Sequence, residues 1–207
     1  MRGVQRAAAR IGRLWETRHV LDWTIVIPIK GTPAAKSRLG GGAELALAIA
    51  LDTVDAARQV GRVIVVTAPA VSSRFAGVQV IADTGHGLAA AIRTGLAAAG
   101  SGPVAVMLGD LPALQPAELR EALALAEHHD RAMVPDSDGQ GTTLITALVA
   151  ADHAPAFGPG SRAAHRAVGY IEIDGGPGLR SDVDTPEQLS ALAGRLGTRT
   201  ASSSRAD

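Results

Sequence analysis

Short apolar runs of strand length alternate along the chain with longer segments of helical periodicity. The apolar runs lie at Thr24–Ile29, Val63–Thr67, Val78–Ile81, Val104–Leu108, Ala132–Val134 and Tyr170–Ile173. The helical patterns lie at Ala43–Val60, Leu88–Ala99, Pro116–His128, Arg162–Val168 and Thr185–Leu196. Strands that are apolar throughout are buried on both faces, as in a parallel sheet covered by helices. The alternation predicts an α/β fold, a three-layer α/β/α sandwich with a mostly parallel sheet, and a strand at Gly141–Thr146 is expected to break the parallel order.

The two ends of the chain differ from this alternating part. Arginines recur at helical spacing within residues 1–20, which predicts a basic N-terminal extension over residues 1–22, either an amphipathic arm or a peripheral segment. From Gly197 to Asp207 the chain is polar, which predicts a disordered tail. Residues 23–196 are expected to form one domain.

The composition excludes several classes of function. Lys and Arg together number 20, as do Asp and Glu, so no charge excess favours nucleic acid or an anionic membrane as a partner. No apolar run approaches the roughly 20 residues of a membrane-spanning helix. The absence of cysteine excludes disulfides and thiolate chemistry, and it fits a cytoplasmic location. The oligomeric state cannot be predicted from these features.

Both lysines of the chain, Lys30 and Lys36, follow the first apolar run. Ligands of such sheets bind beyond the carboxyl ends of the strands, where this loop is expected to lie. Arg38 adds a third cation and Ser37 a hydroxyl, and these groups would suit a triphosphate. The loop matches neither the Walker pattern nor G-x-G-x-x-G. A basic surface loop is the alternative interpretation.

Three carboxylates are expected near the same edge of the sheet. Asp110 follows the apolar run that ends at Leu108, and Asp182 and Asp184 are two residues apart. In extended chain such residues point the same way, so the two would repel unless a cation lies between them. Carboxylate oxygens are suitable ligands for Mg²⁺. The alternatives are a turn or capping residue for Asp110 and two solvated acids for the pair.

Two glycine-rich segments later in the chain predict a second anion site. Thr142 follows a G-Q-G segment, and Gly158 lies within F-G-P-G just before Ser161, where a helix is expected to begin. Hydroxyls and helix-start amides together can bind an anion. An ordinary N-cap is the alternative role for Ser161. His165, one turn later, is expected to be a packed or surface histidine rather than a base.

Five motifs, in this order and spacing, resemble one known family: P-I-K-G-T-P-A-A-K-S-R-L, G-D-L-P-A-L, G-Q-G-T-T, F-G-P-G-S and D-V-D-T-P. It is the phosphoenolpyruvate, or 2-phospho-L-lactate, guanylyltransferase family of coenzyme F-420 biosynthesis. The similarity spans Trp23–Leu189 and implies a nucleotide-diphospho-sugar-transferase-like sheet. The lysine-containing loop is specific, since the related molybdenum-cofactor enzymes have G-G-x-S-x-R-M-G there instead.

The resemblance implies a role for each matching residue. The nucleotide GTP would be bound by Pro28, Lys30, Lys36, Ser37, Arg38 and Asp83, of which Lys30, Lys36 and Arg38 are implied to be catalytic. Mg²⁺ would be bound by Asp110, Asp182 and Asp184. Phosphoenolpyruvate would be bound by Thr142, Gly158 and Ser161. One departure is Ala89, which stands where the family often has an asparagine, so a polar contact to the nucleotide at this position is in question.

The reaction implied is attack of the acid's phosphate on the α-phosphate of GTP, with pyrophosphate leaving and enolpyruvyl-2-diphospho-5'-guanosine as product. The candidate acids phosphoenolpyruvate, 2-phospho-L-lactate and 3-phosphoglycerate share their phosphate and carboxylate groups. The Ala- and Arg-rich composition resembles actinobacterial members of the family, which favours phosphoenolpyruvate. Two other classes remain open: a molybdenum-cofactor or sugar-phosphate nucleotidyltransferase, and a nucleotide-binding regulatory protein, which would not need three carboxylates.

Overall fold

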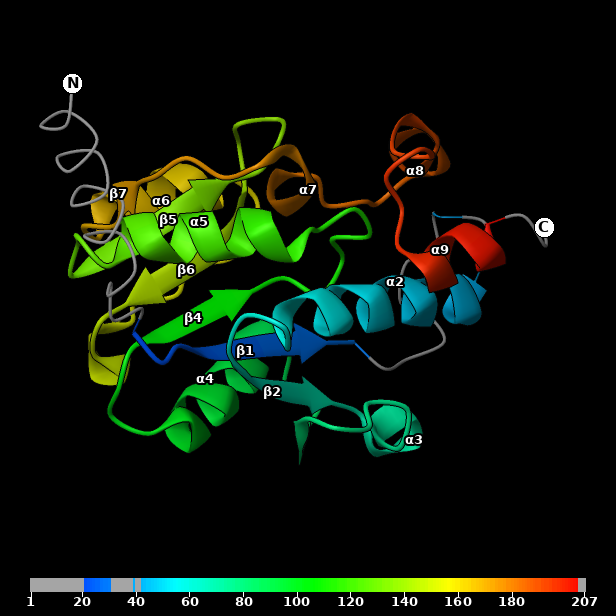
Figure 1. Ribbon diagram of the computed structural model, residues 1–207. Coiled ribbons are helices and arrows are strands. Elements are labelled where there is room, and N and C mark those ends of the chain that lie inside the picture. Colours follow the sequence, from blue (N-terminus) through cyan, green and yellow to red (C-terminus); the bar gives the residue numbers. More distant parts are fainter. Residues whose placement is uncertain (1–20, 31–38, 40–41, 205–207) are drawn as a thin grey trace, which may run out of the picture.

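The computed structural model describes residues 21–30, 39 and 42–204, and a seven-stranded sheet forms its middle layer (Figure 1). The strands are β1 (Thr24–Ile29), β2 (Arg62–Thr67), β3 (Gln79–Ala82), β4 (Val104–Met107), β5 (Arg131–Pro135), β6 (Thr142–Ala147) and β7 (Ile171–Glu172). Their order is β3-β2-β1-β4-β6-β5-β7. All neighbouring pairs are parallel except β4–β6 and β5–β6. The mostly parallel sheet is confirmed, and β6 is the predicted strand that breaks the parallel order.

Helices cover both faces of the sheet. They are α2 (Gly42–Ala57), α3 (Pro69–Ser72), α4 (Leu88–Ala99), α5 (Pro116–Ala126), α6 (Ser161–Ala167), α7 (Pro177–Arg180), α8 (Pro186–Ala191) and α9 (Thr198–Ser203), with a 3-10 turn η2 at Ala150–Asp152. Figure 1 shows α4 on one side of the sheet and α2 and α5 on the other. The predicted three-layer sandwich is therefore confirmed.

Alternate side chains of β1 point to opposite faces of the sheet and pack into two separate hydrophobic cores. Ile25 and Ile27 pack with residues of α2 and α5, whereas Val26 packs with residues of α4. All six residues of β1 are buried, which explains why this strand reads as a continuous apolar run. On the α4 side a Cβ at Gly95 would collide with Val26, so glycine permits the close approach of helix and strand.

The order of the strands reverses between β1 and β4. From β1 the chain moves outward through β2 and β3, and it then returns to place β4 on the other side of β1. The carboxyl ends of β1 and β4 diverge into separate loops at this point, which is where ligands of open α/β sheets bind. Lys30 directly follows β1, and Asp110 follows β4.

The polar tail predicted to be disordered from Gly197 forms α9 instead, and this prediction was wrong for residues 197–204. The Asp52 carboxylate on α2 accepts hydrogen bonds from the backbone N–H groups of Thr200, at 2.8 Å, and Arg199, at 3.3 Å. The Arg199 guanidinium also contacts Asp52 and Asp55. A distant carboxylate thus satisfies the first amides of a helix that composition alone does not favour.

Several helix ends also differ from the predictions. α5 ends at Ala126 rather than His128, and α8 ends at Ala191 rather than Leu196. Residues 1–20, which contain most of the predicted basic extension, and residues 205–207 lie outside the described part of the chain. Within the described part, none of the helices combines the length and apolar character needed to cross a bilayer.

Candidate functional site

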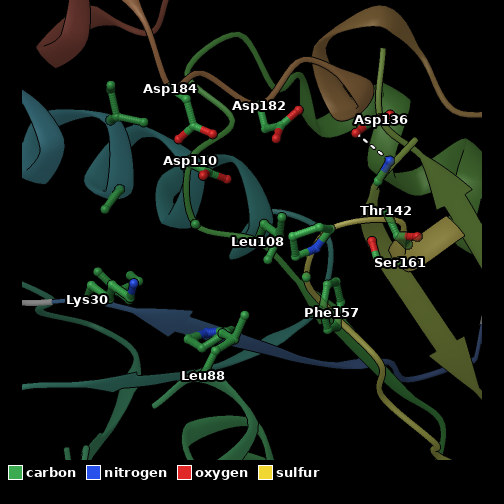
Figure 2. Close-up of a pocket in the computed structure, with 18 of the residues that line it drawn as sticks. Lys30, Leu88, Leu108, Asp110, Asp136, Thr142, Phe157, Ser161, Asp182 and Asp184 are labelled. Atoms are coloured by element: carbon green, nitrogen blue, oxygen red, sulfur yellow. Dashed lines mark hydrogen bonds between the residues drawn. The ribbon is translucent and has the colours of Figure 1, made fainter. Parts of the chain in front are cut away.

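A cavity of about 650 Å³ opens at the carboxyl ends of β1 and β4 (Figure 2). Its wall combines the ends of these strands, the first turns of α2, the first residue of α4, and three loops that contain residues 136–142, 157–161 and 182–184. Apolar side chains such as Ile29, Ile49, Leu88, Leu108 and Phe157 line part of the wall, and polar groups gather on the rest. The cavity coincides with the reversal of strand order.

The three predicted carboxylates, Asp110, Asp182 and Asp184, all line this cavity. Figure 2 shows them along one side of it, on two different segments of the chain. The pKa of the Asp182 carboxyl is raised to about 7, first because the group is largely buried and then because Asp110, Asp136 and Asp184 place negative charge around it. This wall of the cavity would therefore be stabilised by a bound cation.

The carboxylates do not form a ready-made chelating cluster. Within residues 21–30, 39 and 42–204, no three His, Cys, Asp or Glu side chains are placed to hold one metal ion together. Mg²⁺ is commonly bound by one or two carboxylates, with water and substrate phosphates completing its shell. The arrangement of Asp110, Asp182 and Asp184 suits that mode of binding.

Asp136 is a fourth acidic residue of the site, and the sequence interpretation missed it. It follows β5, and its carboxylate accepts hydrogen bonds from the backbone N–H groups of Gln140, at 2.9 Å, and Gly141, at 2.7 Å. A Cβ at Gly141 would collide with this carboxylate, so a larger residue there would have to displace the Asp136 side chain from its hydrogen bonds. The signal that could have found Asp136 is the one that identified Asp110, an acid just beyond an apolar strand.

Cationic groups were predicted on the opposite side of the site. Lys30 lines the cavity across from the carboxylates and is exposed to solvent, and Pro28 lines it as well (Figure 2). Lys36, Ser37 and Arg38 lie outside the described residues, so their roles stay predictions. Asp83 is not among the residues that line the cavity, and its carboxylate accepts a hydrogen bond from the N–H of Gly85 at 3.0 Å. A contact between Asp83 and the nucleotide stays a prediction.

Thr142 and Ser161 lie together at the end of the cavity away from Lys30 (Figure 2), and Gly158 lines the same cavity. The capping residue of α6 is Gly160, with φ of 71°, so the alternative role of Ser161 as an N-cap was wrong. The first two amides of α6 are already bonded within the protein, Ser161 to the carbonyl of Gly158 and Arg162 to that of Gln140. An anion at this end of the cavity would therefore be bound by hydroxyl groups and not by these two amides.

A nucleotide-sized cavity at the reversal of a mostly parallel sheet, with carboxylates facing a lysine, defines a nucleotidyltransferase. The family model of the MobA-like NTP transferase domain matches residues 35–176. A phosphoenolpyruvate guanylyltransferase of Streptomyces coelicolor is 46% identical over 201 residues, which cover 87% of this chain and 95% of that protein. The chain therefore belongs to the phosphoenolpyruvate guanylyltransferase family, within the MobA-like NTP transferases.

Solved structures support the same fold. A protein of Desulfovibrio desulfuricans G20 described as a nucleotide-diphospho-sugar transferase is 19% identical, with a TM-score of 0.65, over 90% of this chain and 95% of that chain. The complex of Rv0371c of Mycobacterium tuberculosis with manganese is 21% identical, with a TM-score of 0.57, over 83% and 97% of the two chains. The nucleotide-diphospho-sugar-transferase-like sheet is confirmed.

Proposed function

We propose that the protein transfers a guanylyl group from GTP to phosphoenolpyruvate, giving enolpyruvyl-2-diphospho-5'-guanosine and pyrophosphate. The observation that carries the proposal is one cavity that brings Thr142, Gly158 and Ser161 together with the carboxylates and Lys30, in a chain 46% identical to a protein named for this activity. The cavity volume of about 650 Å³ is in the usual range for small-molecule sites.

The two substrates are assigned to different parts of the cavity. The triphosphate of GTP would lie between Lys30 and the carboxylate wall, and we propose that Lys36, Ser37 and Arg38, which follow β1 in the sequence, also bind it. The three-carbon acid would lie at the far end, against the Thr142 and Ser161 hydroxyls and the backbone at Gly158. This arrangement puts the phosphate of the acid on the side of the α-phosphate, as the transfer requires.

A divalent cation, which we propose to be Mg²⁺, fits the residues present. The donor set consists of carboxylate oxygens, and the pKa of Asp182 is raised first by burial and then by the negative charge of the neighbouring carboxylates. Asp110, Asp182 and Asp184 are the residues that would hold the ion. When bound, it would neutralise charge on the phosphates that react and leave.

The transfer needs no acid or base from the protein, only side chains that position the substrates and stabilise charge. The nucleophile is a phosphate oxygen that is already anionic, so the new P–O bond to the α-phosphate forms without a general base. The bond between the α- and β-phosphates breaks, and its electron pair leaves with pyrophosphate. Lys30, with Lys36 and Arg38, would stabilise the departing charge, so catalysis reduces to positioning and electrostatic stabilisation.

The direct test is release of pyrophosphate from GTP and Mg²⁺ in the presence of phosphoenolpyruvate, 2-phospho-L-lactate or 3-phosphoglycerate, with products identified by mass. We expect the enolpyruvyl product to dominate when phosphoenolpyruvate and 2-phospho-L-lactate compete at equal concentration for limiting GTP. A dominant lactyl product would contradict the substrate assignment alone. No pyrophosphate release with any of the acids would contradict the guanylyltransferase proposal, whereas the expected product would place the protein in coenzyme F-420 biosynthesis, a cytoplasmic pathway of small molecules.

A further inference from the structure

His165 links two separate walls of the acid-binding end of the cavity. It lies on α6, one turn after Ser161, and none of its side chain is exposed. Its Nε2 accepts a hydrogen bond from the backbone N–H of Ala156 at 2.8 Å, and its Nδ1 lies 3.0 Å from the Oγ1 of Thr142. One imidazole ring thus joins β6, the loop that leads to Gly158, and the helix that begins at Ser161.

The hydrogen bond from Ala156 determines which nitrogen of His165 carries the proton. A backbone amide only donates, so Nε2 must be the unprotonated nitrogen of a neutral ring. The proton is then on Nδ1, which donates to the Thr142 hydroxyl oxygen. Because that oxygen accepts from His165, the hydroxyl hydrogen of Thr142 is left to donate to another acceptor, such as an oxygen of a bound acid.

The surroundings of His165 keep its ring neutral and fixed. Phe157 and Tyr170 pack edge-to-face against it, with ring centroids 5.0 and 5.3 Å away. Burial, and to a smaller extent the nearby His153, lowers the pKa of His165 to about 4. The ring is therefore neutral at physiological pH, and both of its hydrogen bonds persist.

The base of the same loop is anchored independently of His165. The Tyr170 hydroxyl accepts a hydrogen bond from the N–H of Ala154 at 2.9 Å, and it lies 3.0 Å from Nδ1 of His153. The other nitrogen of His153, Nε2, bonds to the carbonyl of Val104 at 2.9 Å. These contacts hold the loop to the core, but of the two histidines only His165 also reaches a residue that lines the cavity opposite the loop.

We propose that His165 is a positioning residue for the three-carbon acid: its ring holds Thr142 and the Gly158 loop at the separation that the phosphate and carboxylate of the substrate need. This inference rests on the proposed function and adds to it a residue that does not itself touch the substrate. His165 takes no part in proton transfer, and its effect is expected to be confined to the acid, because within residues 21–30, 39 and 42–204 its side-chain hydrogen bonds and ring contacts go to Ala156, Thr142, Phe157 and Tyr170.

Replacing His165 with glutamine or with asparagine tests its two hydrogen bonds one at a time. The oxygen of His165→Gln can take the place of Nε2 and accept from Ala156, but Gln cannot donate to Thr142. The nitrogen of His165→Asn can take the place of Nδ1 and donate to Thr142, but Asn cannot reach Ala156. His128→Gln is the matched control, because His128 is exposed beyond the end of α5, on the edge of the sheet opposite the cavity.

The first measurement is steady-state kinetics for both substrates, on variants shown to be folded at the assay temperature. We expect His165→Gln and His165→Asn each to raise KM for phosphoenolpyruvate roughly tenfold, which corresponds to about 1.4 kcal/mol and is the size of one lost neutral hydrogen bond, with KM for GTP within about twofold of wild type. His128→Gln should change neither. Thr142→Val removes the acceptor of His165, so in that background His165→Gln should have no added effect, whereas His165→Asn should still raise KM.

The second measurement does not depend on activity. Nitrogen-15 NMR of histidine-labelled protein should show a neutral His165 with the proton on Nδ1 and none on Nε2. The backbone amide of Ala156 should exchange its hydrogen faster in His165→Asn than in His165→Gln. A proton on Nε2 would overturn the inference, as would unchanged or equally raised KM values for both substrates in active variants. Absence of phosphoenolpyruvate transfer by the wild type would instead overturn the proposed function, and the NMR result would still decide the arrangement of His165.

Discussion

The backbone N–H of Val183 donates a hydrogen bond to the carbonyl of Asp110 at 3.2 Å. This bond joins the segment that follows β4 to the segment that precedes α8. The Val183 side chain is fully buried against Leu45, Ile49 and Leu189. Since side chains alternate in extended chain, residues 182 and 184 point away from that core and toward the cavity.

The same hydrogen bond explains why three acids from two distant segments share one wall. Asp110 is brought beside Asp182 and Asp184 by backbone pairing and by burial of Val183, and neither of these needs a metal ion. Burial first, and then repulsion from the neighbouring carboxylates, raises the pKa of Asp182, so holding these acids ionised is a cost of the metal-free state.

We predict that Asp110→Asn and Asp182→Asn each have two effects: activity falls by orders of magnitude, and the activity that remains depends less on Mg²⁺. Without metal, the midpoint of thermal unfolding should hold or rise, because the substitution removes a charge from a repulsive cluster. Calorimetry with and without Mg²⁺ and a pyrophosphate-release assay measure the two effects. Glu121→Gln, at an exposed position on α5, is the control. A large loss of stability in the metal-free variants would mark these acids as structural.

The parts of the fold predicted from sequence are those that depend on local patterns. The strand at Thr24–Ile29 and the helix at Leu88–Ala99 were predicted with the bounds the structure has, because an apolar run and a clear helical period are properties of neighbouring residues. Asp110 and Thr142 were both predicted as site residues and both line the cavity: Asp110 follows the end of β4, and Thr142 begins β6, which runs antiparallel to β4 and so starts at the same edge.

The parts that were missed depend on partners distant in sequence. α9 is capped by Asp52, 148 residues before Thr200, and no local pattern in the polar tail signals that contact. Asp136 was missed because the predicted strand ended at Val134 and the motif that resembles the family begins at Gly139, so Asp136 lay between the two. The role of His165 needs the positions of Ala156 and Thr142, which only the folded chain brings together.

We predict that Lys30→Ala lowers turnover by orders of magnitude and leaves the thermal midpoint unchanged. Lys30 is exposed, so its loss removes no buried contact, but it faces the carboxylate wall where the departing pyrophosphate would need a cation. Lys30→Arg should recover part of the activity, and Arg120→Ala, an exposed cation on α5, should have none of the effect. Activity of Lys30→Ala within a few-fold of wild type would refute this role.

We predict that the contribution of His165 to stability is lost as the pH is lowered from about 6.5 to about 4, whereas the raised pKa of Asp182 acts in the opposite direction. His165 has an ordinary pKa of 6.5 when unfolded and about 4 when folded, so the unfolded chain binds the proton first. Its contribution is complete above the unfolded pKa and is lost as the pH falls toward the folded one, by at most roughly 3 kcal/mol. Burial lowers the pKa of His153 in the same direction.

Urea unfolding of wild type and His165→Gln across this pH range measures the contribution. The glutamine variant is expected to be less stable than wild type at pH 7, and this difference in the free energy of unfolding should shrink as the pH falls from about 6.5 to about 4, because the variant lacks one titrating group. His153 stays in both proteins, so the difference in slope reports His165 alone. Parallel pH profiles for the two proteins would show that His165 is not held neutral by the fold.

The last prediction concerns the contact between Asp52 and α9. The Asp52 carboxylate accepts from the N–H groups of Arg199 and Thr200, and its side chain is nearly buried. Asp52→Ala should lower the free energy of unfolding by about 1–2 kcal/mol, as loss of a helix cap does, and should speed amide exchange at Thr200.

Asp52→Asn keeps an acceptor oxygen and should lose less stability. Asp55→Asn weakens partly exposed ion pairs with Arg199 and Arg58 and should cost about 1 kcal/mol or less. Because Asp52 does not line the cavity, KM for both substrates should stay at the wild-type value well below the unfolding temperature. Unchanged exchange at Thr200 in Asp52→Ala would show that α9 is held by its other contacts with α2.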